Sequence, residues 1–131
     1  MQRVMCKSLI HHATVTRADL RHEASIMIDA DLMDAADIHE FERVQIVDVT
    51  GGARFETYAV PAPRGSGDVV LAGVVAEAGL SGNVVSIVSF ATYGDAELMT
   101  HRPCVVCAGA GNVIAHRTGT PYWTQCVYQG N

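Results

Sequence analysis

Apolar and polar residues along the chain form many short, β-branched runs separated by turn signals. These runs predict strands at residues 4–6, 9–15, 25–29, 44–49, 54–60, 69–75, 84–92 and 104–108. Many short strands at such spacing are typical of a barrel or a sandwich. The pattern therefore predicts a mainly β fold.

One stretch follows a helical period instead. Four apolar residues can share one face of a helix over residues 32–43: Leu32, Ala35, Ala36 and Phe41. Asp31 is a candidate N-cap, because a carboxylate there accepts hydrogen bonds from the free N–H groups of the first turn. Asp34 complements the positive end of the helix dipole. We expect one main helix that covers one side of the β core.

Length and charge narrow the class of protein. The 131 residues are 49% hydrophobic, which suits one domain over residues 1–131 with a sizeable core. Fourteen acidic against nine basic residues give a net charge of −5, which argues against a nucleic-acid partner. No apolar run reaches the roughly 20 residues that span a bilayer, and no apolar segment follows the N-terminal charges. We expect a cytoplasmic protein without a membrane partner.

The cysteines raise the question of a metal. Cys104 and Cys107 have the spacing of a metal-binding pair, but a strand over residues 104–108 would turn their sulfurs to opposite faces. We therefore expect no metal site. In a reducing compartment all four cysteines, with Cys6 and Cys126, are expected to be free thiols.

The strand at residues 54–60 is the first candidate for chemistry. Arg54, Glu56 and Tyr58 fall on one face of it. Arg54 and Tyr58 are about 13 Å apart at their Cα atoms, so their long side chains can converge on one small anion. A guanidinium and a phenol suit a small carboxylate substrate. The alternative is an edge strand that carries a surface pair of Arg54 and Glu56.

Ser25 is the second candidate. It follows a polar segment, residues 19–23, and opens an apolar strand. By itself a serine at this position is most often a residue of strand entry. The sequence contains no nucleophile elbow, P-loop or dinucleotide fingerprint.

Taken together, these segments resemble the pyruvoyl-dependent aspartate 1-decarboxylase family. The matching segments run along nearly the whole chain: residues 5–16 with His11, Ala18-Asp19-Leu20, Ser25, residues 28–36, the strand with Arg54, Thr57 and Tyr58, and Arg64-Gly65-Ser66-Gly67. The resemblance implies a small double-psi β-barrel with one main helix. It also implies a homotetramer with active sites between subunits.

The resemblance further implies self-cleavage between Ala24 and Ser25. The Ser25 hydroxyl attacks the Ala24 carbonyl, and the acyl group moves from the Ser25 nitrogen to its oxygen to give an ester. β-Elimination of this ester, followed by loss of ammonia, leaves a pyruvoyl group at the start of the new C-terminal fragment. This group forms a Schiff base with aspartate and accepts electrons while CO₂ leaves, so that β-alanine is the product. The chain would then be a carboxy-lyase made as a zymogen.

Family roles carry over residue by residue. Arg54 would hold a substrate carboxylate, Tyr58 would protonate the carbanionic intermediate, and Thr57 would align the peptide that is cleaved. The substrate pocket would also include His11, Gly73, Val74 and Val75.

Three positions depart from the family pattern. Ala24 stands where the family has glycine, Leu9 where it commonly has lysine, and Ala72 where it has asparagine. If position 24 needs a positive φ, alanine there costs about 1–2 kcal/mol. Lys7 lies two residues before Leu9. These changes support an alternative: an unprocessed family member that uses Arg54, Tyr58 and His11 for cofactor-independent acid/base chemistry on a less anionic small molecule in a biosynthetic pathway.

Overall fold

The structure is a computed structural model in which residues 1–118 are described. Nine strands make up most of it: β1 (Gln2–Thr14), β2 (Arg17–Asp19), β3 (Ser25–Asp29), β4 (Arg43–Asp48), β5 (Arg54–Ala62), β6 (Val69–Ala72), β7 (Val84–Gly94), β8 (Cys104–Ala108) and β9 (Ile114–Thr118). Two α-helices, α1 (Ala30–Ala36) and α2 (Asp95–Leu98), and two 3₁₀ helices, η1 (Gly73–Ala78) and η2 (Ala110–Asn112), connect them. The chain is mainly β, as predicted.

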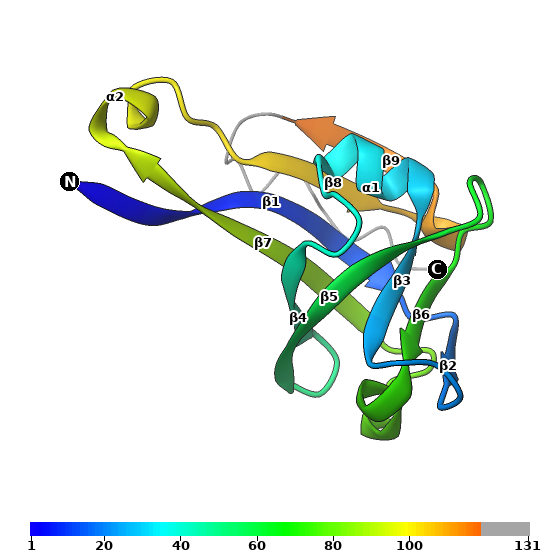
Figure 1. Cartoon of the computed structure of the whole chain (residues 1–131). Coiled ribbons are helices and arrows are strands. Elements are labelled where there is room, and N and C mark those ends of the chain that lie inside the picture. The colour runs from blue at the N-terminus through cyan, green and yellow to red at the C-terminus, as the bar shows by residue number, and fades with distance from the viewer. Residues whose placement is uncertain (119–131) are drawn as a thin grey trace.

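The strands form one strongly curved sheet in the order β2-β6-β3-β5-β4-β7-β1-β8-β9 (Figure 1). β1 and β2 follow each other in the chain, yet β2 pairs with β6 at the far side of the sheet. Thr16, between them, donates its backbone N–H to the Val69 carbonyl at 2.8 Å, and its hydroxyl bonds the same residue. One continuous segment thus joins both sides of the sheet, which confirms a small β-barrel.

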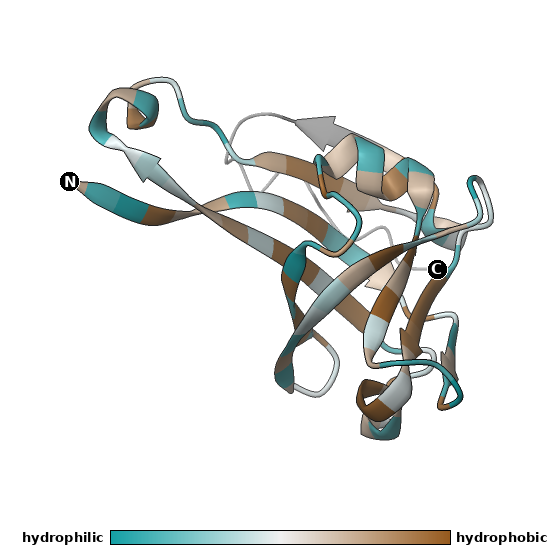
Figure 2. Cartoon of the chain, in the orientation of Figure 1, coloured by the Kyte–Doolittle hydropathy of each residue, from teal (hydrophilic) through white to brown (hydrophobic). Residues whose placement is uncertain are grey.

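The barrel interior is filled by aliphatic side chains from successive strands. Fully buried examples come from six of them: Ile10, Ile26, Ile46, Leu71, Ile87 and Val106. Figure 2 shows hydrophobic residues concentrated along the strands and hydrophilic ones in the loops. Burial of this apolar surface is the main source of stability. Within residues 1–118, no helix is long and apolar enough to cross a membrane.

Three of the predicted strands had clearly wrong bounds, and three more differ from the structure by one or two residues at an end. The strands expected at residues 4–6 and 9–15 are one long strand, β1, whose pairing with β7 is interrupted by two register shifts. The strand expected at residues 69–75 ends at Ala72, because Gly73 has φ +67° and turns the chain into η1. β2 and β9 were not predicted.

The main helix is shorter than predicted and begins earlier. Its N-cap is Asp29, whose side chain accepts the Asp31 N–H, so the choice of Asp31 as N-cap was wrong. The helix ends where Asp37 takes a left-handed conformation (φ 55°) and donates its N–H to the carbonyls of Asp34 and Met33. A left-handed residue that donates its N–H to carbonyls of the last turn is a common C-terminal cap of an α-helix.

Asp29 also anchors the loop between β5 and β6. Its carboxylate, 4% exposed, accepts the backbone N–H groups of Gly65 at 3.0 Å and Gly67 at 2.9 Å, besides that of Asp31. Burial by itself would raise the pKa of Asp29. The donors from Gly67, Asp31 and Gly65, together with the charge of Arg64, outweigh burial and hold the pKa below its ordinary 3.8.

Replacing Asp29 with alanine is expected to lower the free energy of unfolding by about 2–4 kcal/mol, because three N–H groups lose their acceptor. Since folding lowers the Asp29 pKa, its contribution is present above 3.8 and is lost as the pH falls through the folded value. Urea unfolding should therefore show a gap between wild type and variant that narrows in acid. Asp31→Ala, at a residue 46% exposed in its side chain, is the control with the smaller expected loss. Equal losses in the two variants would contradict this role of Asp29.

Candidate active site

Ser25 is the first residue of β3, which lies between β5 and β6. It is 5% exposed, and its hydroxyl donates to the Glu23 carbonyl at 3.2 Å. On the β6 side Ser25 pairs directly with Ala72, which is fully buried. A small, fully buried residue therefore lies opposite the buried Ser25 at the start of β3.

Gly73 lies against the Glu23–Ala24 peptide, which directly precedes the predicted cleavage site. A Cβ on Gly73 would lie 2.7 Å from the Cα of Ala24 and 2.7 Å from the carbonyl carbon of Glu23, and closer still to the Ala24 nitrogen. Real Cβ atoms do not approach backbone so closely. Both this contact and its positive φ make glycine the only residue that fits here without a shift of the backbone.

Ala24 does not have the positive φ that its place in the family pattern suggested. Positive φ values among the described residues other than glycine occur at His12, Asp37, Phe41 and Asn112. Ala24 is not among them, so the expected conformational penalty at the residue before Ser25 is absent.

Tyr58 and Thr57 lie on β5, beside β3. The two strands are parallel, and Ile26 pairs with Ala59, so Tyr58 stands level with Ser25 one residue earlier. Ile26 and Ala59 point into the core. Because side chains alternate along a strand, Tyr58 and Ser25 share the opposite face. Both Thr57 and Tyr58 are half-buried.

Arg54 lies at the other end of the same strand. It is exposed, and within residues 1–118 it forms no ion pair. Glu56 pairs instead with Arg43 at 2.7 Å, and β5 is an interior strand, so the alternative of an edge strand with an Arg54–Glu56 pair was wrong. Arg54 shares a face with Tyr58 but begins about 13 Å away.

His11 lies in the same row of the sheet as Arg54 and away from Ser25. Its Nδ1 is 3.4 Å from the Ser86 hydroxyl, Ser86 pairs with Val47, and Val47 pairs with Arg54. The ring stacks on His12 at 3.7 Å. Burial, and then the neighbouring His12, lower the pKa of His11. His11 on β1 and Arg54 on β5 thus lie in one row but three strands apart, with β7 and β4 between them.

Two residues of the 73–75 segment have different surroundings. Val74 is 74% exposed, whereas Val75 packs against the barrel core. Gly73, the first residue of the segment, lies against Glu23 and Ala24, which precede the predicted cleavage site.

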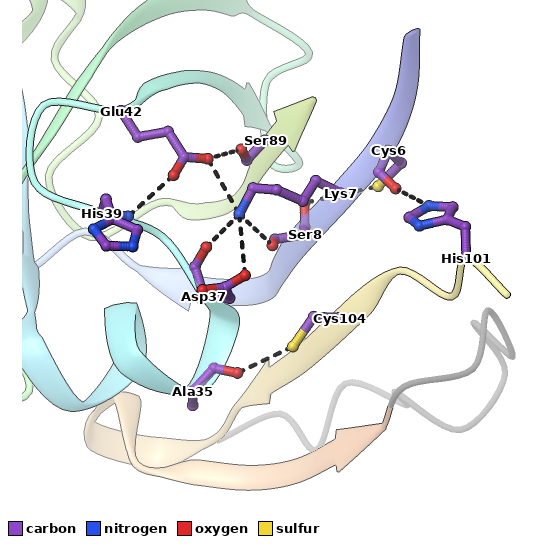
Figure 3. Close-up of polar contacts among 10 residues, drawn as sticks. All are labelled: Cys6, Lys7, Ser8, Ala35, Asp37, His39, Glu42, Ser89, His101 and Cys104. Atoms are coloured by element: carbon purple, nitrogen blue, oxygen red, sulfur yellow. Dashed lines mark hydrogen bonds and ion pairs between the residues drawn. The ribbon is translucent and has the colours of Figure 1, made fainter. Parts of the chain in front are cut away.

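Leu9 stands where the family commonly has a lysine, and Lys7 lies two residues before it. Leu9 is buried in an apolar cluster with Val105 and Cys107. Lys7 is turned toward the end of α1: its Nζ lies 3.2 Å from Glu42 Oε2 and also donates to the Asp37 carbonyl (Figure 3). Lys7 is thus engaged in a network with Glu42 and the end of α1.

Cysteines and one surface groove of the described residues were further candidates for a site. Cys6 and Cys104 are free thiols as expected, but Cys107 is disulfide-bonded, which contradicts the expectation for that residue; Cys126 lies outside the described residues. No group of His, Cys, Asp or Glu within residues 1–118 could hold a metal ion.

A groove of about 500 Å³ runs between Arg43 and Phe90 and includes none of the predicted site residues.

The sequence interpretation missed Phe41, which it placed on the buried face of the helix. Phe41 lies beyond the helix, is 67% exposed, and has φ +70°. Its ring lies 6.0 Å from that of Tyr58, centroid to centroid. No pattern in the sequence signals a phenylalanine in the left-handed region.

The described residues form a small β-barrel in which Ser25 is buried at the start of β3, Gly73 lies against the Glu23–Ala24 peptide and Tyr58 stands level with Ser25. Residues 1–115 match the aspartate decarboxylase family. The chain belongs to this family.

Curated relatives agree over most of their length. The aspartate 1-decarboxylase of Heliobacterium modesticaldum is 51% identical over 106 residues, which cover 81% of this chain and 80% of the relative. Those of Methylibium petroleiphilum and Syntrophobacter fumaroxidans are each 46% identical, and cover 87% and 86% of this chain and 95% and 90% of the relatives.

Proposed function

We propose that this protein is an aspartate 1-decarboxylase that converts L-aspartate to β-alanine and CO₂. The observation that carries the proposal is the match to relatives of that name over more than four-fifths of the chain. Ser25, Thr57, Tyr58 and Arg54 all fall within the matched family region. The alternative of an unprocessed enzyme for another substrate is not favoured, because these relatives are aspartate 1-decarboxylases.

In this proposal Ser25 is the residue that matures. Its burial, its small neighbour Ala72 and the close contact of Gly73 with Ala24 suit a group formed from the chain itself, for which no separate cofactor pocket is needed. A pyruvoyl group formed from Ser25 would supply a ketone that bonds the substrate amine and accepts the electron pair released with CO₂.

The residues of β5 act around that position. Tyr58, level with Ser25, would deliver a proton from its phenol to the carbon that loses CO₂. Thr57 precedes Tyr58 on β5, and its hydroxyl would align the peptide to be cleaved. Gly73 lets the η1 backbone approach the same point.

Arg54 would hold a carboxylate of the substrate. The family expectation of active sites between the subunits of a homotetramer would let Arg54 of one copy serve Ser25 of another. A second copy would then present the Arg54 and His11 row to Ser25, and the unpaired guanidinium would meet a carboxylate as a charge-assisted pair.

Purified protein is expected to release CO₂ from L-aspartate and to form β-alanine in equal amount. Tyr58→Phe keeps the ring and loses only the hydroxyl, so kcat should fall by about 10²-fold while self-cleavage and the thermal midpoint are retained. Unchanged turnover in this variant would remove the hydroxyl from the mechanism. Absence of CO₂ release by the wild type would refute the proposed function.

A further inference from the structure

Phe41 has an unusual backbone conformation next to the candidate site. It lies between α1 and β4 with φ +70° and is 67% exposed. A bulky residue in the left-handed region is a conformational outlier, because its Cβ crowds the following carbonyl. Such a conformation persists only where the surrounding structure imposes it.

A β-bulge imposes this conformation. The Phe41 N–H donates to the Ala59 carbonyl at 2.7 Å, and the Ala59 N–H donates to the Glu42 carbonyl at 2.9 Å. Two residues therefore oppose one, and regular pairing begins with Arg43 opposite Tyr58. In bulges of this kind the first residue is left-handed and is usually glycine; bulges beside active sites redirect side chains.

The bulge directs the Phe41 ring onto Tyr58. The ring centroids are 6.0 Å apart and the planes are inclined by 55°. This geometry lies within the range of favourable tilted aromatic pairs. The contact restricts the Tyr58 ring from the side of the 39–42 turn.

Glu42 anchors the turn from the other side (Figure 3). Its Oε1 accepts the His39 N–H at 3.0 Å, and its Oε2 contacts the Ser89 hydroxyl and Lys7 Nζ, the latter at 3.2 Å. The Lys7 and Glu42 side chains are only 18% and 21% exposed. Lys7 also donates to the Asp37 carbonyl, so β1, β7 and the end of α1 hold the turn together.

We propose that Phe41 is a positioning residue that holds the Tyr58 ring where its hydroxyl delivers a proton to the substrate, and that the Lys7–Glu42 pair keeps the strained bulge in place. This inference rests on the proposed function, since it assigns Phe41 a task in the same reaction. It explains why a phenylalanine occupies a position that suits glycine.

The test compares Phe41→Gly with wild type. Glycine fits the bulge without strain, so the thermal midpoint should be equal or higher and self-cleavage should be complete by intact mass. Loss of the ring should lower kcat for aspartate by about tenfold and change KM by less than about twofold. Phe41→Tyr, which keeps the ring, should restore most of kcat.

A double-mutant cycle separates positioning from other effects. In a Tyr58→Phe background, Phe41→Gly should cause no further loss of kcat, because the group it positions is absent. Independent losses in the two variants would overturn the proposal, as would unchanged kcat in Phe41→Gly. A change in assembly size of Phe41→Gly would also overturn it, by making the exposed ring an interface residue. If wild type released no CO₂ from aspartate, the proposed function would fail before this comparison was reached.

Discussion

Ser25→Ala is expected to yield a full-length chain that has no measurable decarboxylase activity, a loss of at least about 10³-fold. Alanine has no hydroxyl to attack the Ala24 carbonyl, and no ketone can form from it. Because Ser25 lies in a small buried space, the shorter side chain should fold normally. Release of CO₂ from aspartate, measured beside the circular dichroism spectrum, checks both statements.

Arg54→Ala provides the matched comparison for this loss. It should be cleaved normally at position 25 but should bind aspartate poorly, because the exposed guanidinium is the candidate carboxylate ligand. If sites form between subunits, co-expression of Ser25→Ala with Arg54→Ala should restore activity that neither variant has alone. Full activity of Ser25→Ala would remove Ser25 from the mechanism, and absence of restoration would place both residues of a working site in one chain.

Gly73→Ala is expected to slow self-cleavage by at least about tenfold. The new methyl group would lie 2.7 Å from the Cα of Ala24, so the peptide before Ser25 must move. The extent of cleavage after fixed times of incubation, followed by intact mass, measures the effect.

Gly79→Ala is the control for this substitution. Gly79 has φ +69°, close to the +67° of Gly73, but a Cβ there meets no atom within 4 Å. Both alanines carry the conformational cost of about 1–2 kcal/mol, and only the one at position 73 disturbs Ala24. Equal cleavage rates in the two variants would show that the contact between Gly73 and Ala24 is not important for maturation.

The sequence predicted the strands well where β-branched residues alternate in short runs. Residues 25–29 and 104–108 have the predicted bounds, and Ser25 and Tyr58 could be named from the resemblance. β2 has only three residues and pairs far along the chain, so no local pattern reveals it. The helix prediction ran too far, because the left-handed turn at Asp37 is set by capping and not by hydrophobic period.

The candidate site was less predictable than the fold, for reasons that lie in tertiary contacts. The strain expected at Ala24 is absent, whereas strain occurs at Phe41, where the bulge opposite Ala59 imposes it. The position of Lys7 in the sequence suits either binding of a substrate carboxylate or an ion pair within the chain. The pairing of Lys7 with Glu42 depends on the tertiary structure and could not be read from the sequence.

Intact mass of the purified protein under denaturing conditions tests the central claim most directly, namely that Ser25 is converted by self-cleavage into the group on which decarboxylation depends. The account predicts two species, residues 1–24 and residues 25–131, with the larger lacking a free amino terminus. A single species of residues 1–131 that persists through prolonged incubation and still releases CO₂ from aspartate would contradict it.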